Sequence, residues 1–203
     1  MSSEGYIKFN CIRNEEDICI PEKFFQSLSK WRQIMHETGL IGVYPNGIGY
    51  GNLSIRANSN SFYISGTSTG KLKMLEEKHY ALVNSWSITD NSLKCSGMIN
   101  ASAESLSHAA VYEILPQTGA VIHVHHKGMW DKYINSKPAT SMRVSYGSPE
   151  MALEIQKVIL EMKPHRENFL VMGGHEEGLI AWGNTLDEAG EIILKHFNSF
   201  LEG

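Results

Sequence analysis

Residues 119–125 read Gly-Ala-Val-Ile-His-Val-His and are the most informative stretch of the chain. Their apolar character predicts a strand over 120–125, in which successive side chains point to opposite faces of a sheet. Ile122 and Val124 then face one side, and His123 and His125 face the other. Two such imidazoles, about 6.6 Å apart along the strand, can share one metal ion at about 2.0–2.1 Å from each nitrogen. The alternative is a pair of partly exposed histidines on a solvated strand face.

A candidate acid–base group lies on the element before this strand. Residues 102–115 predict a helix ended by Pro116, and Glu104 and His108, four residues apart, share one of its faces. The short connection over 116–119 brings the helix back over the strand. A carboxylate beside a metal is what proton transfer next to a Lewis acid needs. The alternative is an exposed first-turn glutamate, which the helix dipole favours.

A third histidine follows two glycines, in Gly173-Gly174-His175. The glycines let the backbone turn sharply between two apolar strand candidates and place the imidazole out of the sheet. This histidine would complete the three-ligand, open-position arrangement of a catalytic metal site; the alternative is an ordinary turn histidine. Glu176 and Glu177 come next, either as a solvated acidic tip or with one of them as a further ligand.

Two earlier loops are candidates for anion binding. Gly51-Asn52 and residues 66–71, Gly-Thr-Ser-Thr-Gly-Lys, combine small residues, hydroxyl groups and backbone N–H groups. Such loops can form a concave site for phosphate. The second loop is not a P-loop, because the spacing of its glycines and lysine differs. The alternative is a pair of turns without a ligand.

The predicted elements indicate one layered domain over residues 1–203. Because helices and short strands mix, with hairpins early in the chain, we expect an α/β fold with a largely antiparallel sheet rather than a doubly wound parallel one. Helices are predicted over about 21–38, 102–115, 149–162 and from 185 onward, hairpins over 53–65 and 80–96, and single strands over 120–125, 169–172 and 179–182.

Composition and charge exclude several classes of protein. The chain of 203 residues is 42% hydrophobic and 20% charged, which excludes a disordered or coiled-coil protein. Its net charge of −4 gives no basic excess for nucleic acid or an anionic membrane, and its apolar runs are too short for a spanning helix. The polar first residues carry no signal-peptide core, and three sparse cysteines indicate reduced thiols. We therefore expect a cytoplasmic protein with neither nucleic-acid nor membrane partners.

Taken in order, these motifs resemble the class II aldolase/adducin family, which includes L-fuculose phosphate aldolase and L-ribulose phosphate 4-epimerase. The resemblance covers about residues 23–200. The matching segments are 51–56, 64–70, 101–104 with His108, 119–125, 146–150 and 175–186. The chain departs from the family pattern at Ala103, where a serine is common, and by two additional residues after His175.

The resemblance implies a three-layer α/β/α sandwich around a mainly antiparallel central sheet. It also implies zinc, or another divalent transition metal, bound by His123, His125 and His175, with Glu104 as the catalytic acid–base group. The phosphate- or substrate-binding residues would be Gly51, Asn52, Thr69, Gly70 and Ser102. Family members are commonly homotetramers with sites at subunit interfaces.

The resemblance implies a metal-dependent lyase of carbohydrate metabolism. We expect an aldolase that cleaves or forms a C–C bond of a small ketose, a sugar or sugar phosphate, through a metal-stabilised enediolate. A sugar-phosphate 4-epimerase or a dehydratase would use the same site. A non-catalytic adducin-like binding module is the alternative from another class, and retention of the three histidines and Glu104 argues against it.

Overall fold

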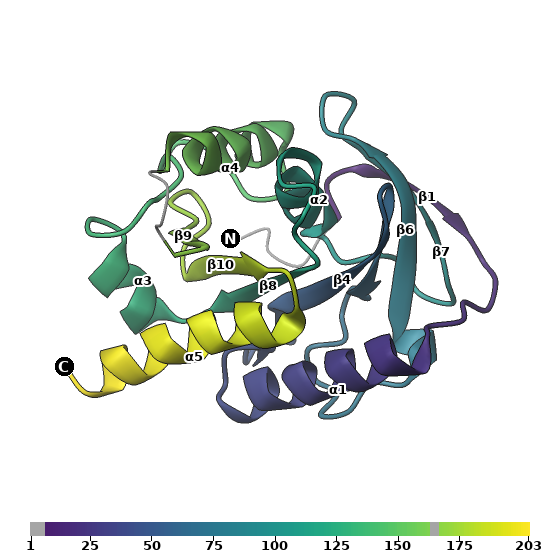
Figure 1. The fold of residues 1–203 in the computed structure, drawn as a ribbon, viewed down its shortest axis with the longest axis horizontal. Coiled ribbons are helices and arrows are strands. Elements are labelled where there is room, and N and C mark those ends of the chain that lie inside the picture. The colour runs from purple at the N-terminus through teal and green to yellow at the C-terminus, as the bar shows by residue number, and fades with distance from the viewer. Residues whose placement is uncertain (1–6, 163–166) are drawn as a thin grey trace.

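The computed structural model describes residues 7–162 and 167–203, which build helices on both faces of one eight-stranded sheet (Figure 1). The strand order is β1-β7-β6-β5-β4-β8-β10-β9. Among the strand pairs of this sheet in the described residues, β1 and β7 are parallel and the other six pairs are antiparallel. The strands are β1 (Asn10–Asn14), β4 (Asn52–Asn58), β5 (Ser61–Ser65), β6 (Tyr80–Ser87), β7 (Ser92–Ser96), β8 (Ala120–His125), β9 (Phe169–Val171) and β10 (Gly178–Gly183).

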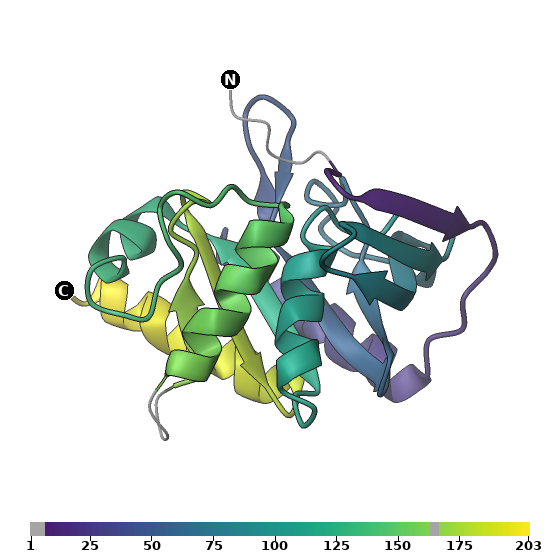
Figure 2. The ribbon, with the colours of Figure 1, turned by 90° about the horizontal axis from the view of Figure 1, so that it is seen from above.

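The helices form the two outer layers. One face of the sheet carries α1 (Glu22–Glu37), α3 (Lys127–Tyr133) and α5 (Leu186–Leu201), and the other carries α2 (Ser105–Ile114) and α4 (Pro149–Glu161) (Figures 1 and 2). The predicted three-layer sandwich is confirmed, with a sheet that is mixed because of its β1 edge. A hairpin of β2 (Gly42–Val43) and β3 (Gly49–Tyr50) stands out from the body in Figure 2.

Local sequence accounts for the helix ends. At α4, Ser148 Oγ accepts a hydrogen bond from the Met151 N–H at 3.3 Å, and Pro149 opens the helix. At α5, Thr185 Oγ1 accepts from the Glu188 N–H at 3.1 Å. The reciprocal bond that would complete a capping box is displaced by one residue, because Glu188 Oε2 accepts from the N–H of Asn184 rather than from that of Thr185.

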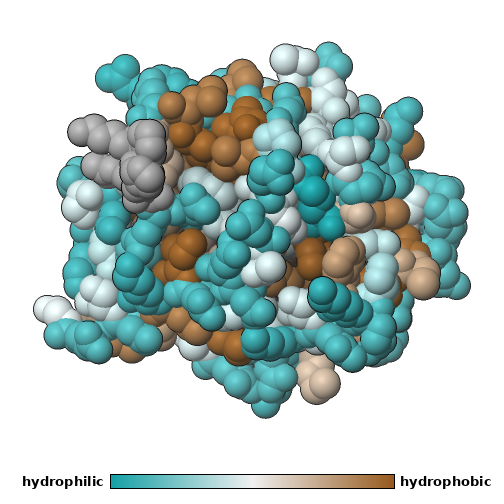
Figure 3. Space-filling model, viewed as in Figure 1, coloured by the Kyte–Doolittle hydropathy of each residue, from teal (hydrophilic) through white to brown (hydrophobic). Residues whose placement is uncertain are grey.

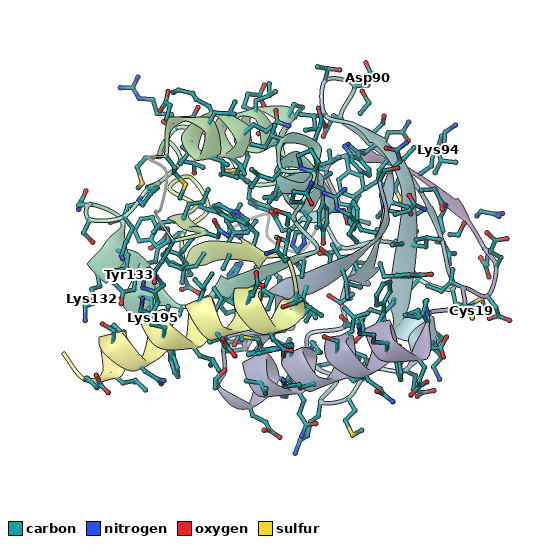
Figure 4. The ribbon with its side chains drawn as sticks, viewed as in Figure 1. Cys19, Asp90, Lys94, Lys132, Tyr133 and Lys195 are labelled. Atoms are coloured by element: carbon teal, nitrogen blue, oxygen red, sulfur yellow. The ribbon has the colours of Figure 1, made fainter. Side chains whose placement is uncertain are left out.

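Several elements were not predicted from the sequence. The edge strand β1 alternates exposed and half-buried residues and includes no large apolar run. Helix α3 has seven residues, too few to show a helical period. It is anchored on α5, since Tyr133 Oη donates to His196 O at 2.9 Å and Lys132 Nζ to Ser199 O at 2.8 Å. Figure 4 shows Lys132 and Tyr133 near Lys195 of α5 at this end of the molecule.

The apolar core lies in two clusters, one on each side of the sheet. Apolar residues also gather on the surface over α4, where Leu153 and Leu160 are exposed (Figure 3). Cys11, Cys19 and Cys95 are free thiols. None of the helices in the described part of the chain has the length and apolar character that a membrane crossing needs.

Candidate metal centre

Three histidines converge on the α2/α4 side of the sheet. His123 and His125 share a face of β8 with Val121, as the alternation predicts, and His175 enters from the turn between β9 and β10. The antiparallel pairing of β8 with β10 brings Gly178 opposite His125 and so returns this turn to the end of β8. His125 Nε2 lies 2.9 Å from His123 Nε2 and 2.8 Å from His175 Nε2. All three side chains are buried.

Glycines allow the close approach of His175. A Cβ atom on Gly174 would lie 1.7 Å from Val144 O, so no larger residue fits there without moving the backbone. A Cβ atom on Gly178 would lie 2.3 Å from His175 Cδ2 and 3.2 Å from His123 Cε1. The missing side chains therefore make room for the third imidazole beside the other two.

The chemistry of this donor set fits a metal ion. His123 Nδ1 donates to Leu179 O at 3.0 Å; because a carbonyl only accepts, Nδ1 carries the proton and Nε2 presents its lone pair. Burial lowers the pKa of His123 to about 4. Burial, and repulsion from neighbouring cationic groups such as a protonated His123, hold the pKa values of His125 and His175 well below their usual range. Three neutral imidazoles that point their Nε2 atoms together suit a divalent transition metal with one position left open.

Glu104 faces the same pocket from the start of α2. It is the N-cap residue of that helix, and its side chain is buried. Its Oε2 accepts a hydrogen bond from Ser107 Oγ at 2.6 Å, and its N–H donates to Ser102 Oγ at 3.3 Å. His108, which helical spacing places on the same face, lies in the core, with Nδ1 2.7 Å from Ser54 Oγ. Only Glu104 of this pair lines the pocket.

The pocket has a volume of about 330 Å³ and joins the candidate metal and anion sites. Every residue that the resemblance implied lies in its lining: His123, His125, His175, Glu104, Gly51, Asn52, Thr69, Gly70 and Ser102. Asn52 lies opposite His123 in the pairing of β4 with β8. Its buried Oδ1 has no hydrogen-bond partner among residues 7–162 and 167–203.

A buried arginine anchors the loop on one side of the pocket. Arg32 of α1 is 1% exposed, and its Nη2 donates to the carbonyl oxygens of Thr69, Gly70 and Leu72 at 3.0–3.3 Å. Burial lowers the pKa of this guanidinium, yet arginine stays protonated in proteins. The positively charged Arg32 side chain therefore holds the loop of Thr69, Gly70 and Leu72 in place through its backbone carbonyl groups.

Sequence reasoning missed the aromatic residues of the site. The Tyr50 ring stacks on His125 with centroids 5.5 Å apart, and the Tyr146 ring meets His175 edge-on at 4.7 Å. Tyr44 Oη lies 2.9 Å from His125 Nδ1 and donates to Glu177 Oε2 at 2.5 Å. Glu177 is therefore neither a solvated tip nor part of the three-histidine group. No spacing signal links Tyr44 to residues so distant in the chain.

Comparison with known proteins places the chain in a family. Residues 45–195 match the family described as "Class II Aldolase and Adducin N-terminal domain". This match spans most of the chain, so the chain belongs to the class II aldolase and adducin family. The predicted family is confirmed, and family members include lyases, both aldolases and dehydratases.

Individual proteins resemble this chain in sequence or in structure. The methylthioribulose-1-phosphate dehydratase of Leptospira biflexa is 27% identical over 177 residues, which cover 70% of this chain and 80% of that protein. The corresponding Leptospira interrogans protein is 25% identical, with 74% of each chain covered. A solved L-fuculose 1-phosphate aldolase superposes with a TM-score of 0.66 at 18% identity, covering 90% of this chain and 85% of that one. The enzyme from Thermus thermophilus gives 0.64 at 18% identity, with 90% and 93% covered. These two structures support the fold.

Proposed function

We propose that this protein is a metal-dependent lyase of the aldolase type, acting on a small ketose 1-phosphate. The observation that carries this proposal is the placement of Glu104 and the three histidines in the lining of one pocket. The names of the relatives support the substrate class, since fuculose 1-phosphate and methylthioribulose 1-phosphate are both ketose 1-phosphates.

His123, His125 and His175 would hold the metal ion, and zinc suits three neutral imidazole ligands. When bound, the ion supplies Lewis-acid stabilisation of negative charge on the substrate. Asn52, Thr69 and Ser102, with the backbone of Gly51 and Gly70, would hold the phosphate group. The Arg32 guanidinium behind the loop adds a positive charge on that side.

Glu104 would move the proton. In the cleavage direction the bond breaks between the carbon next to the ketone (Cα) and the hydroxyl-bearing carbon beyond it (Cβ). The Cβ hydroxyl gives its proton to water and becomes the aldehyde carbonyl, and the electron pair of the broken bond remains on Cα as an enediolate. Glu104, as the acid, donates a proton to that carbon; in condensation its carboxylate removes the same proton. The Ser107 hydroxyl holds Oε2, which fixes the direction in which the carboxyl group faces the pocket.

A dehydratase is the second candidate, because the sequence relatives at 25–27% identity carry that name. A dehydratase removes water and leaves the carbon skeleton intact, whereas an aldolase releases two smaller carbonyl compounds. We further propose a cytoplasmic homotetramer, on the family resemblance; light scattering of the purified protein measures its mass.

The test is an assay of the zinc-loaded protein with both ketose 1-phosphates, followed by NMR of the products. Release of dihydroxyacetone phosphate identifies an aldolase, and a diketone phosphate with all carbons retained identifies a dehydratase. Glu104→Gln should keep one metal per chain and lower kcat by about 10²–10⁴-fold, the range for loss of a general acid–base group. Glu113→Gln, on the exposed end of the same helix, is the control. Near-normal turnover by Glu104→Gln would exclude the proposed role.

A further inference from the structure

A hydrogen-bonded chain stands behind His125, on the side away from the other two histidines. His125 Nδ1 lies 2.9 Å from Tyr44 Oη, and Tyr44 Oη lies 2.5 Å from Glu177 Oε2. Tyr44 belongs to the hairpin of β2 and β3, whose turn is closed by bonds from Tyr44 N to Ile48 O and from Gly47 N to Tyr44 O. Three segments distant in sequence therefore meet at one imidazole.

The chemistry of the donors and acceptors determines which group donates each hydrogen bond between His125, Tyr44 and Glu177. A carboxylate only accepts hydrogen bonds, so the Tyr44 hydroxyl donates to Glu177. The phenolic oxygen keeps a lone pair for an N–H group, and His125 Nδ1 is the nitrogen within reach. The proton of the neutral imidazole then lies on Nδ1, and Nε2 presents its lone pair toward His123 and His175. That is the tautomer in which a histidine binds a metal through Nε2.

The backbone at Glu177 supports a specific role for its side chain. Glu177 has a φ of +73°, in the left-handed region that favours glycine, although Gly178 follows it directly. Such strain persists where surrounding structure over-determines it, often at functional sites. The Glu177 carbonyl accepts from His126 N at 2.9 Å, which ties it to the end of β8. The neighbouring Glu176 is exposed and lies 3.5 Å from Lys127, so only one of the two carboxylates reaches Tyr44.

We propose that Tyr44 and Glu177 are positioning residues that set the tautomer and ring orientation of His125 for metal binding. Metal-ligating histidines usually donate their second N–H to a carboxylate or carbonyl partner. His123 does so directly to Leu179 O; for His125 a tyrosine hydroxyl stands between imidazole and carboxylate. This inference rests on the proposed function in one respect, that the three histidines bind a metal.

The experiment measures metal affinity rather than turnover. Wild type, Tyr44→Phe, Glu177→Gln and the double variant are stripped of metal and titrated with zinc against a chromophoric chelator. The controls are Tyr63→Phe, which removes a phenolic hydrogen bond to Cys19 O away from the pocket, and Glu176→Gln, which neutralises the adjacent carboxylate. Circular dichroism of each metal-free variant checks its fold.

We expect Tyr44→Phe and Glu177→Gln to weaken zinc binding by about 10–100-fold, as loss of such partners does in other metal sites. The double variant should be no weaker than Tyr44→Phe alone, because both residues act through one chain of bonds. The visible absorption bands of the cobalt-substituted variants should shift, whereas both controls should match wild type.

Two results would overturn the inference, and they are distinguishable. If wild type binds zinc and the variants bind it equally tightly with unchanged cobalt spectra, the positioning role is wrong and the proposed function stands. If wild type binds no zinc or cobalt, the metal site itself fails and the proposed function fails with it.

Discussion

Glu177 places a carboxyl side chain on a backbone that favours glycine. The left-handed conformation costs an ordinary residue about 1–2 kcal/mol, whereas glycine carries an entropic penalty of about 0.5–1 kcal/mol elsewhere. At position 177, glycine is therefore expected to give a more stable protein than alanine, the reverse of the order found elsewhere. We expect Glu177→Gly to be more stable than Glu177→Ala by about 1 kcal/mol, as measured by urea unfolding of the metal-free proteins.

Both substitutions remove the carboxylate, so the comparison isolates the backbone contribution from the lost bond to Tyr44. Equal stability, or a more stable alanine variant, would show that residue 177 is not strained.

For single residues, the sequence predicts which face of a strand a side chain lies on better than it predicts which distant residue that side chain contacts. The two-residue period of a strand is enough to put His123 and His125 on one face, and the structure agrees. The helical spacing of Glu104 and His108 is less informative, because Glu104 sits at the N-cap, before the helical period begins. His108 instead meets Ser54 on β4. Tyr44 was beyond prediction, since a loop residue gains its partners only from the tertiary fold.

At the scale of elements, Arg32 connects α1 to the loop that lines the pocket. Replacing its guanidinium with an apolar side chain, in Arg32→Met, should free the loop carbonyls and loosen the candidate phosphate site. We expect KM for a ketose 1-phosphate to rise about tenfold with little change in kcat, since a hydrogen bond to a charged group contributes about 1.5–3 kcal/mol. Steady-state kinetics measure both constants.

Lys30→Met is the matched control, because Lys30 is an exposed cation on the same helix, paired with Asp187 at 2.6 Å. Thermal unfolding of both variants shows whether the helix keeps its packing. A KM unchanged by Arg32→Met would show that the Arg32 hydrogen bonds to this loop do not contribute to substrate binding.

Elements with a long apolar period or a hairpin turn were predicted within a few residues. Helix α1 and the hairpin of β4 and β5 are examples. Elements that were missed are short or lie at an edge, such as α3 and β1. Their stability comes from contacts with distant segments, for example Tyr133 with His196, which a local pattern does not contain.

At the scale of the whole molecule, buried histidines link stability to pH. Burial lowers the folded-state pKa of His123 to about 4 and those of His125 and His175 well below 6.5. As pH falls below about 6.5, the unfolded chain therefore takes up protons before the folded chain does. Stability is full above that pH and declines toward the folded pKa values, by up to about 1.4 kcal/mol per pH unit for each histidine.

This decline is measured by urea unfolding of the chelator-treated protein between pH 7.5 and pH 4.5. His123→Asn should show a shallower decline, because one buried imidazole is gone. Saturating zinc should protect the wild type until acid displaces the ion, since ligands must be deprotonated to bind it. An identical slope in His123→Asn would show that this residue takes up its proton equally in both states.

The register between β4 and β8 fixes the position of Asn52 relative to His123. Asn52 and His123 lie opposite each other on paired strands, and Ser102 and Glu104 directly precede α2, which lies on that side of the sheet. In the proposed reaction, the hydrogen bonds of the sheet therefore set the distance from Asn52, one of the proposed phosphate ligands, to the metal-binding histidines, and Arg32 holds the loop that carries the other ligands Thr69 and Gly70. We therefore expect the site to select substrates by the number of atoms between the phosphate group and the reacting carbonyl group.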